Sequence, residues 1–147
     1  MKECRLIYKS LSTDEIVSNE TLQEIIEKGS KNNSEKDISG LLLLTGNQFL
    51  QVLEGPLEEV NQLYLKICKD TRHHHVNLLN FELIAERYFE TWNMRLVDLW
   101  DLPGTQREFL LSKYKSKDEV IEIPDNFLEI YSLLLDAKSF CTSTPWK

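Results

Sequence analysis

The chain has 147 residues, enough for one domain with its own hydrophobic core and a short appendage. Its formal net charge of -7 argues against direct binding to the phosphate backbone of nucleic acids. The 3 cysteines include no Cys-x-x-Cys pair and no apolar run reaches bilayer length, so we expect a cytoplasmic protein without a disulfide framework, structural zinc or a membrane span.

The first predicted element is a strand over residues 4–9. Apolar and polar side chains alternate there, which places Tyr8 on the same face as Cys4 and Leu6. The polar residues 11–18 are expected to form a loop.

A helix is expected next. A Thr-x-x-Glu signal at residues 21–24 marks its start, with Asn19 as an earlier alternative, and residues 31–34 are a polar exit. Gly29 falls on the apolar side of this helix, which indicates either a C-cap or a close approach by another group. The apolar side consists of Leu22, Ile25, Ile26 and Gly29.

A β-hairpin is predicted over residues 37–55, because two apolar runs flank Gly46-Asn47, a two-residue turn that supplies positive φ angles. This turn pairs Leu42 with Gln51 and puts the Gln51 amide in a row of apolar side chains. A buried amide costs ~1–3 kcal/mol unless it is hydrogen-bonded. Gln51 is therefore either a structural residue bonded to nearby backbone or part of a site for a polar ligand, and the pattern leaves both open.

The remaining elements follow in alternation. Pro56 suits the first turn of an amphipathic helix that is expected to end near Lys69. The further predictions are a polar connection at residues 70–75, strands at 79–86 and 94–99, and helices at 106–113 and 126–137.

The order βαββαβ, followed by a strand and two helices, predicts an α+β fold of the ferredoxin-like kind. The first and third strands are neighbours in that topology, so Tyr8 and Gln51 are candidates for contact on the face that the first two helices cover. The other face of the hairpin is also apolar, and we expect the C-terminal helices to cover it. Their apolar stripe is Phe127, Ile130, Tyr131 and Leu134.

Several separated segments point to one family. They are RLIYKS, KNNSEKDISGLLL, QFLQVLEG, RHH and WNM, in this order. Over residues 3–100 the chain resembles a BLUF domain, a flavin-binding blue-light sensor. Residues 101–147 resemble, more loosely, the helical cap of short stand-alone members, so we expect a sensor domain at 1–100 and a helical extension at 101–147. The resemblance implies FAD held without a covalent bond between the first two helices, with its ring on the sheet.

The resemblance also implies roles for individual residues. The photoactive set is Tyr8, Gln51, Trp92, Met94 and Ser10. The set expected to hold the cofactor is Asn33, Gln51, Asn32, Tyr8, Ile25, Lys66, Arg72 and His73. Within it, Asn33 matches the asparagine that binds the carbonyl edge of the flavin. Ser39 and Asn93 depart from the family pattern, which has threonine and a small residue at these positions.

The family implies a photoreceptor and not an enzyme. Light would drive electron and proton transfer between Tyr8 and the flavin through Gln51, whose amide has a donor and an acceptor end. The rearranged amide would change the hydrogen bond to the flavin and shift its absorption slightly to the red. We expect the output to be a protein–protein contact, in a homo-oligomer or with a downstream regulator, because residues 101–147 leave no room for a catalytic domain.

Other interpretations stay open for the same residues. Tyr8 alone is typical of an ordinary strand. The run at residues 73–75 could suggest a metal site, but three consecutive side chains diverge. A small phosphate hydrolase on this fold needs an arginine in a glycine-rich loop, and residues 8–13 contain none. A flavin-free interaction module or ligand-binding regulator is the remaining alternative, and the colour of the purified protein separates it from a flavoprotein.

Overall fold

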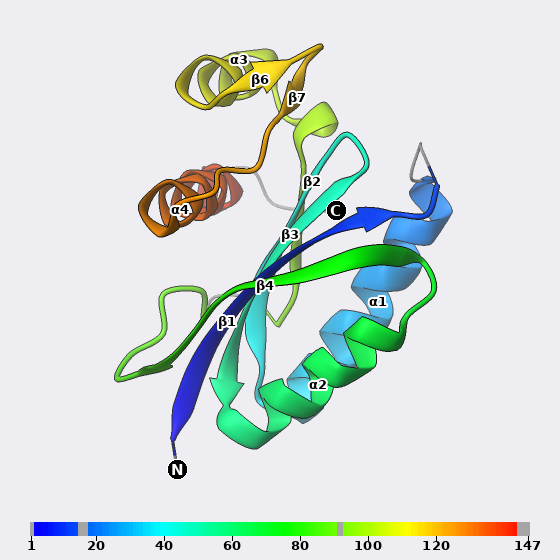
Figure 1. Cartoon of the computed structure of the whole chain (residues 1–147), viewed down its shortest axis with the longest axis vertical. Helices are drawn as coiled ribbons and strands as arrows, with labels where there is room; N and C mark the ends of the chain where they lie inside the picture. The colour runs from blue at the N-terminus through cyan, green and yellow to red at the C-terminus, as the bar shows by residue number, and fades with distance from the viewer. Residues whose placement is uncertain (1, 15–17, 91–92, 144–147) are drawn as a thin grey trace.

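The computed structural model describes residues 2–14, 18–90 and 93–143, and it has one large sheet with helices on both faces (Figure 1). The strand order in this sheet is β4-β1-β3-β2-β5. The strands are β1 (Glu3–Ser12), β2 (Ser39–Thr45), β3 (Gln48–Pro56), β4 (His73–Ile84) and β5 (Arg95–Asp98). Neighbouring strands are antiparallel, apart from the parallel pair β2 and β5. The ferredoxin-like α+β prediction with an added fifth strand is confirmed.

The helices form two layers. Helices α1 (Asn19–Glu35) and α2 (Leu57–Lys69) cover one face of the sheet, and the C-terminal elements lie on the other (Figure 1). Those elements are the short helix η1 (Leu99–Asp101), α3 (Gly104–Lys113), the small strands β6 (Ser116–Lys117) and β7 (Val120–Ile121), and α4 (Phe127–Ser143). Within the described residues, no helix has both the length and the apolar character needed to cross a membrane.

The hairpin of β2 and β3 has the predicted register. Leu42 pairs with Gln51, and Gly46 in the turn has a φ of 61°. On its other side, β3 pairs with β1 so that Tyr8 lies opposite Gln51. The hairpin is close-packed at Gly40, where a Cβ atom would stand 2.2 Å from the Val52 carbonyl oxygen.

The C-terminal layer covers the apolar back of the hairpin, as predicted. Leu41, Leu43, Leu50 and Val52 form one buried cluster with residues of α3, β7 and α4. The predicted stripe is wrong at Phe127, which is 41% exposed. Leu133 and Ala137 are buried on α4 instead, because the side of the helix that faces the sheet continues about one turn beyond the predicted stripe.

Three predicted boundaries are also wrong. Strand β1 continues to Ser12, since pairing with β3 and β4 extends it into the expected loop. Helix α1 is capped by Ser18, whose hydroxyl accepts from the Thr21 backbone N–H, and it runs past residues 31–34 to Glu35. Strand β4 begins at His73, inside the expected connection, because it pairs with the end of β1.

Candidate flavin site

A cavity of about 220 Å³ lies between α1 and α2, with the sheet as its floor. Its lining includes most of the residues that the sequence singled out. These are Tyr8, Ile25, Asn32, Asn33, Gln51, Lys66, Arg72, His73 and Met94. The segments that carry them are far apart in the chain, and the βαββαβ topology brings them to one place.

Tyr8 and Gln51 form a direct hydrogen bond on the cavity floor. The Tyr8 hydroxyl donates to Gln51 Oε1 at 2.5 Å, and the two side chains are 4% and 3% exposed. Burial raises the pKa of the Tyr8 phenol far above its usual range, and the nearby acidic side chains of Cys68, Tyr64 and Asp70 add to the shift. Tyr8 is therefore a neutral phenol, and in this structure it donates to the amide oxygen of Gln51.

The other end of the Gln51 amide meets Met94. Gln51 Nε2 donates to the Met94 sulfur at 3.4 Å, and a thioether is a weak acceptor. Gly29 makes room for this side chain, since a Cβ there would stand 3.4 Å from Met94 Cε. The glycine in the apolar stripe thus marks the close approach of another group and not the end of the helix.

Asn33 ties α1 to the segment before β5. It is 1% exposed, and its Nδ2 donates to the Asn93 carbonyl at 2.7 Å. Asn93 in turn donates from its side chain to the Ile38 carbonyl at 3.2 Å. The departure from the family pattern at Asn93 therefore has a structural use here, because the longer side chain links this segment to the start of the hairpin.

Ser10 lies behind the cavity and acts on it through His73. His73 Nε2 donates to the Ile67 carbonyl at 2.6 Å, and its Nδ1 lies 2.7 Å from the Ser10 hydroxyl. With Nε2 carrying the proton, Nδ1 accepts from Ser10. The ring thus joins the end of α2 to β1 and packs edge-on beside Tyr8, with ring centroids 6.2 Å apart.

The mouth of the cavity is basic. Lys66 and Arg72 lie there together with Lys28, which sequence reasoning missed although it follows Ile25 at the spacing of one helical turn. Arg72 is paired with Asp70 at 2.5 Å, and its hydrogen bonds hold the pKa of Asp70 below its usual range. A phosphate that binds Arg72 has to share the guanidinium with this carboxylate.

Two further points of the sequence analysis concern Trp92 and a metal site at residues 73–75. Trp92 lies outside the described residues. In the part of the chain that the structure does describe, no group of three or more His, Cys, Asp or Glu side chains is placed to hold a metal ion. His73 points inward to Ser10, away from any such role.

The donors and walls of the cavity suit a flat heteroaromatic ligand with a phosphate tail. Ile25, Leu42 and Phe49 give apolar contact surface, and the amides of Gln51 and Asn33 can recognise ring heteroatoms. Lysine and arginine at the mouth suit phosphate groups. The residues present therefore fit a flavin nucleotide.

Comparison with known proteins agrees with this geometry. The family model described as "BLUF: Sensors of blue-light using FAD" matches residues 4–95. The "Blue light- and temperature-regulated antirepressor BluF" of Escherichia coli (strain K12) is 37% identical over 95 residues, covering 64% of this chain and 23% of that protein. The "Photoactivated adenylate cyclase subunit beta" of Euglena gracilis is 30% identical over 112 residues, covering 75% of this chain and 12% of that protein. The chain thus spans less than a quarter of the length of these relatives.

Solved structures show the same fold over more of the chain. "BlsA ground state" has a TM-score of 0.73 at 28% identity, covering 90% of this chain and 87% of that one. "BlrB - a BLUF protein, dark state structure" has a TM-score of 0.71 at 24% identity, covering 96% and 97%, and supports the fold. The family match, the relatives and the Tyr8–Gln51 floor of the cavity lead to one conclusion: the chain belongs to the BLUF family of flavin-dependent blue-light sensors.

Proposed function

We propose that the cavity between α1 and α2 holds FAD without a covalent bond, and that Tyr8 and Gln51 turn the absorption of blue light into a new hydrogen-bond pattern. The observation that carries this proposal is the buried Tyr8–Gln51 hydrogen bond of 2.5 Å, with the Met94 sulfur as a weak acceptor at the other end of the amide. FAD is preferred to FMN because the basic mouth offers three cations, enough for a diphosphate.

The roles of the holding residues follow from their places. Ile25 on α1 would contact the ring from the helix side, and Asn33 and Gln51 would bond its polar edge. Asn32, Lys66 and Arg72 would hold the tail, and His73 would line the site beside Tyr8. Residues 1–100 form the sensor, and residues 101–147 form the helical extension behind it.

The light step uses the side chains on the floor. When bound and excited, a flavin is a one-electron oxidant. Tyr8 is the phenol on the cavity floor, and on giving up an electron to the flavin it would release its proton along its hydrogen bond to Gln51 Oε1. As Oε1 gains this proton, Gln51 can release another from Nε2 toward the flavin, which leaves the imidic tautomer, or it can rotate about its last side-chain bond. Rotation turns the amide oxygen toward the Met94 sulfur, and a thioether cannot bond an acceptor, whereas the tautomer keeps a single N–H at Nε2. When the electron and proton return to Tyr8, Gln51 either keeps its new hydrogen bonds or goes back to the original ones. No substrate is consumed.

The output we propose is a protein–protein contact, in a homo-oligomer or with a downstream regulator in the cytoplasm. The names of the relatives describe an antirepressor and cyclase subunits, so related sensors act on different effectors. Size-exclusion chromatography with light scattering, in the dark and under blue light, measures whether the mass or the bound partners change. Identical mass and partners in both states, with the photocycle intact, contradict this output.

One experiment tests the cofactor. The purified protein is expected to be yellow, and denaturation should release FAD that a column separates from FMN. A flavin-free regulator on this fold is the alternative, and it predicts a colourless protein that takes up neither flavin.

A further inference from the structure

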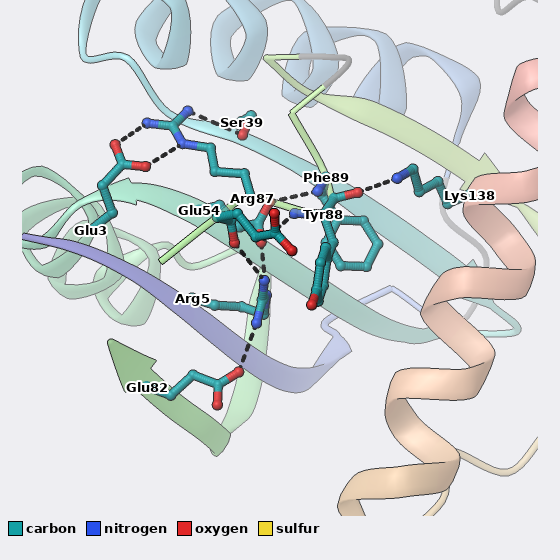
Figure 2. Close-up of polar contacts among 10 residues, drawn as sticks. Glu3, Arg5, Ser39, Glu54, Glu82, Arg87, Tyr88, Phe89 and Lys138 are labelled. Carbon is teal, nitrogen blue, oxygen red and sulfur yellow. Dashed lines mark hydrogen bonds and ion pairs between the residues drawn. The ribbon is translucent and has the colours of Figure 1, made fainter. Parts of the chain in front are cut away.

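The sheet face opposite the cavity carries a buried ion cluster around Glu54 (Figure 2). Glu54 is 0% exposed and Arg5 is 4% exposed, and Arg5 Nε donates to Glu54 Oε2 at 2.7 Å. Arg5 also pairs with Glu82 at 2.7 Å. Charges are buried in this way only where hydrogen bonds satisfy them, so the cluster fixes the position of every group that it joins.

Glu54 also holds the segment that follows β4. Its two carboxylate oxygens accept from the backbone N–H groups of Tyr88 and Phe89, at 3.1 and 2.6 Å. Phe89 is fully buried, and Arg5 lies over the Tyr88 ring at 4.7 Å. The Glu54 carboxylate on β3 therefore holds the chain after β4 at Tyr88 and Phe89, next to Arg87, which is bonded to Glu3 and Ser39.

Beyond residues 91–92, which lie outside the described part of the chain, the next two residues are at the cavity. Asn93 is bonded to Asn33, and Met94 accepts from Gln51. Glu54 and Gln51 lie on one strand, three residues apart, so they face opposite sides of the sheet. Strand β3 thus holds the start of the segment with one side chain and contacts its end with the other.

Helix α4 closes the arrangement. Lys138 donates to the Tyr88 carbonyl, and its ammonium lies 5.7 Å from the centre of the Phe89 ring (Figure 2). Tyr131, about two turns earlier on α4, lies over Arg5 at 5.4 Å. The peptide unit between Tyr88 and Phe89 is therefore held on both sides: its N–H donates to Glu54, and its carbonyl accepts from Lys138.

We propose that Glu54 is the positioning residue for Met94 at Gln51, and that Lys138 couples this position to α4. The inference deepens the proposed function, since it assigns the route by which a change at Gln51 reaches the C-terminal layer. In this proposal, a shift of Met94 changes the position of Tyr88 and Phe89, which Glu54 holds. Because Lys138 is bonded to the Tyr88 carbonyl, α4 then shifts as well.

The experiment follows the Met94 methyl group, which is easy to observe because the chain has 2 methionines. In flavin-loaded protein with ¹³C-labelled methionine methyls, Glu54→Gln and Lys138→Leu are expected to move the Met94 resonance in the dark. Lys138→Arg should restore the wild-type position. The matched control is Lys113→Leu, which removes the 2.9 Å ion pair between Lys113 at the end of α3 and Asp136 on α4 but no contact to this segment. An unmoved Met94 resonance in Glu54→Gln and Lys138→Leu, or an equal shift in the control, overturns the positioning claim.

The second readout is hydrogen exchange along α4 in the dark and under blue light. Lys138→Leu should keep the red shift of the flavin and lose the light-dependent change in α4, while Lys113→Leu keeps both. A wild-type light response of α4 in Lys138→Leu overturns the coupling. If the wild-type protein shows no red shift, the proposed function fails, and the dark methyl readout still decides the positioning claim. If Glu54→Gln does not fold, Lys138→Leu carries both readouts.

Discussion

The Tyr8–Gln51 hydrogen bond predicts a specific pattern of stabilities in a double-mutant cycle. Tyr8→Phe leaves the buried Gln51 oxygen without its donor, and Gln51→Leu leaves the buried Tyr8 hydroxyl without its acceptor. Each single change is expected to cost ~1–3 kcal/mol, because an unpaired buried polar group pays its full desolvation penalty. The double variant removes both polar groups, and it should cost less than the sum by ~1–3 kcal/mol.

The assay is urea unfolding of the flavin-free chain, in the dark, for the wild type, the two single variants and the double variant. Equal slopes against urea show that the midpoints report stability alone. In thermal unfolding each kcal/mol corresponds to about 2–4 °C for a chain of this size. Costs that add to within about 0.5 kcal/mol would show that the two side chains are not energetically coupled, and the reasoning from the structure would be refuted.

Three further predictions concern packing, the cofactor and pH. Gly40→Ala should disrupt the hairpin, because its Cβ would stand 2.2 Å from a carbonyl of the facing strand, whereas Gly104→Ala, with no atom within 4 Å, should leave the unfolding midpoint equal or higher. Asn33→Ala should speed flavin dissociation by about tenfold or more, since it removes a buried amide of the cavity that we propose bonds the polar edge of the flavin, at ~1–3 kcal/mol, and unchanged dissociation contradicts this role. Burial raises the pKa of Tyr8, so its contribution to stability is fully present below the ordinary phenol pKa of about 10 and is lost as pH rises above it. Unfolding midpoints measured between pH 9 and pH 11 should fall less steeply in Tyr8→Phe than in wild type, and equal slopes would contradict the shift.

The hairpin could be predicted from the sequence in detail. A two-residue turn fixes which residues face each other, and a slip of one residue would turn every apolar side chain to the wrong face. The order of elements also predicts Tyr8 beside Gln51, and the register of β1 and β3 confirms it. The same register also places Arg5 opposite Glu54, so this ion pair was within reach of sequence reasoning once β1 and β3 were neighbours.

Other parts of the site could not be predicted from local sequence patterns. The polar residues 31–34 look like a helix exit, but tertiary bonds such as that of Asn33 to Asn93 keep the helix going to Glu35. The contact of Lys138 with Tyr88 depends on the path of the segment after β4 and on the angle at which α4 packs. Neither this path nor this packing angle can be predicted from a short stretch of neighbouring residues.

The most direct test of the account is the light-minus-dark absorption spectrum of the flavin-loaded protein. We expect a reversible red shift in the wild type, and no such shift in Tyr8→Phe or Gln51→Leu variants that still hold flavin. A wild-type protein that binds flavin without a reversible shift would contradict the light-sensing role of the cavity. A normal shift in either variant would contradict the assignment of that role to Tyr8 and Gln51.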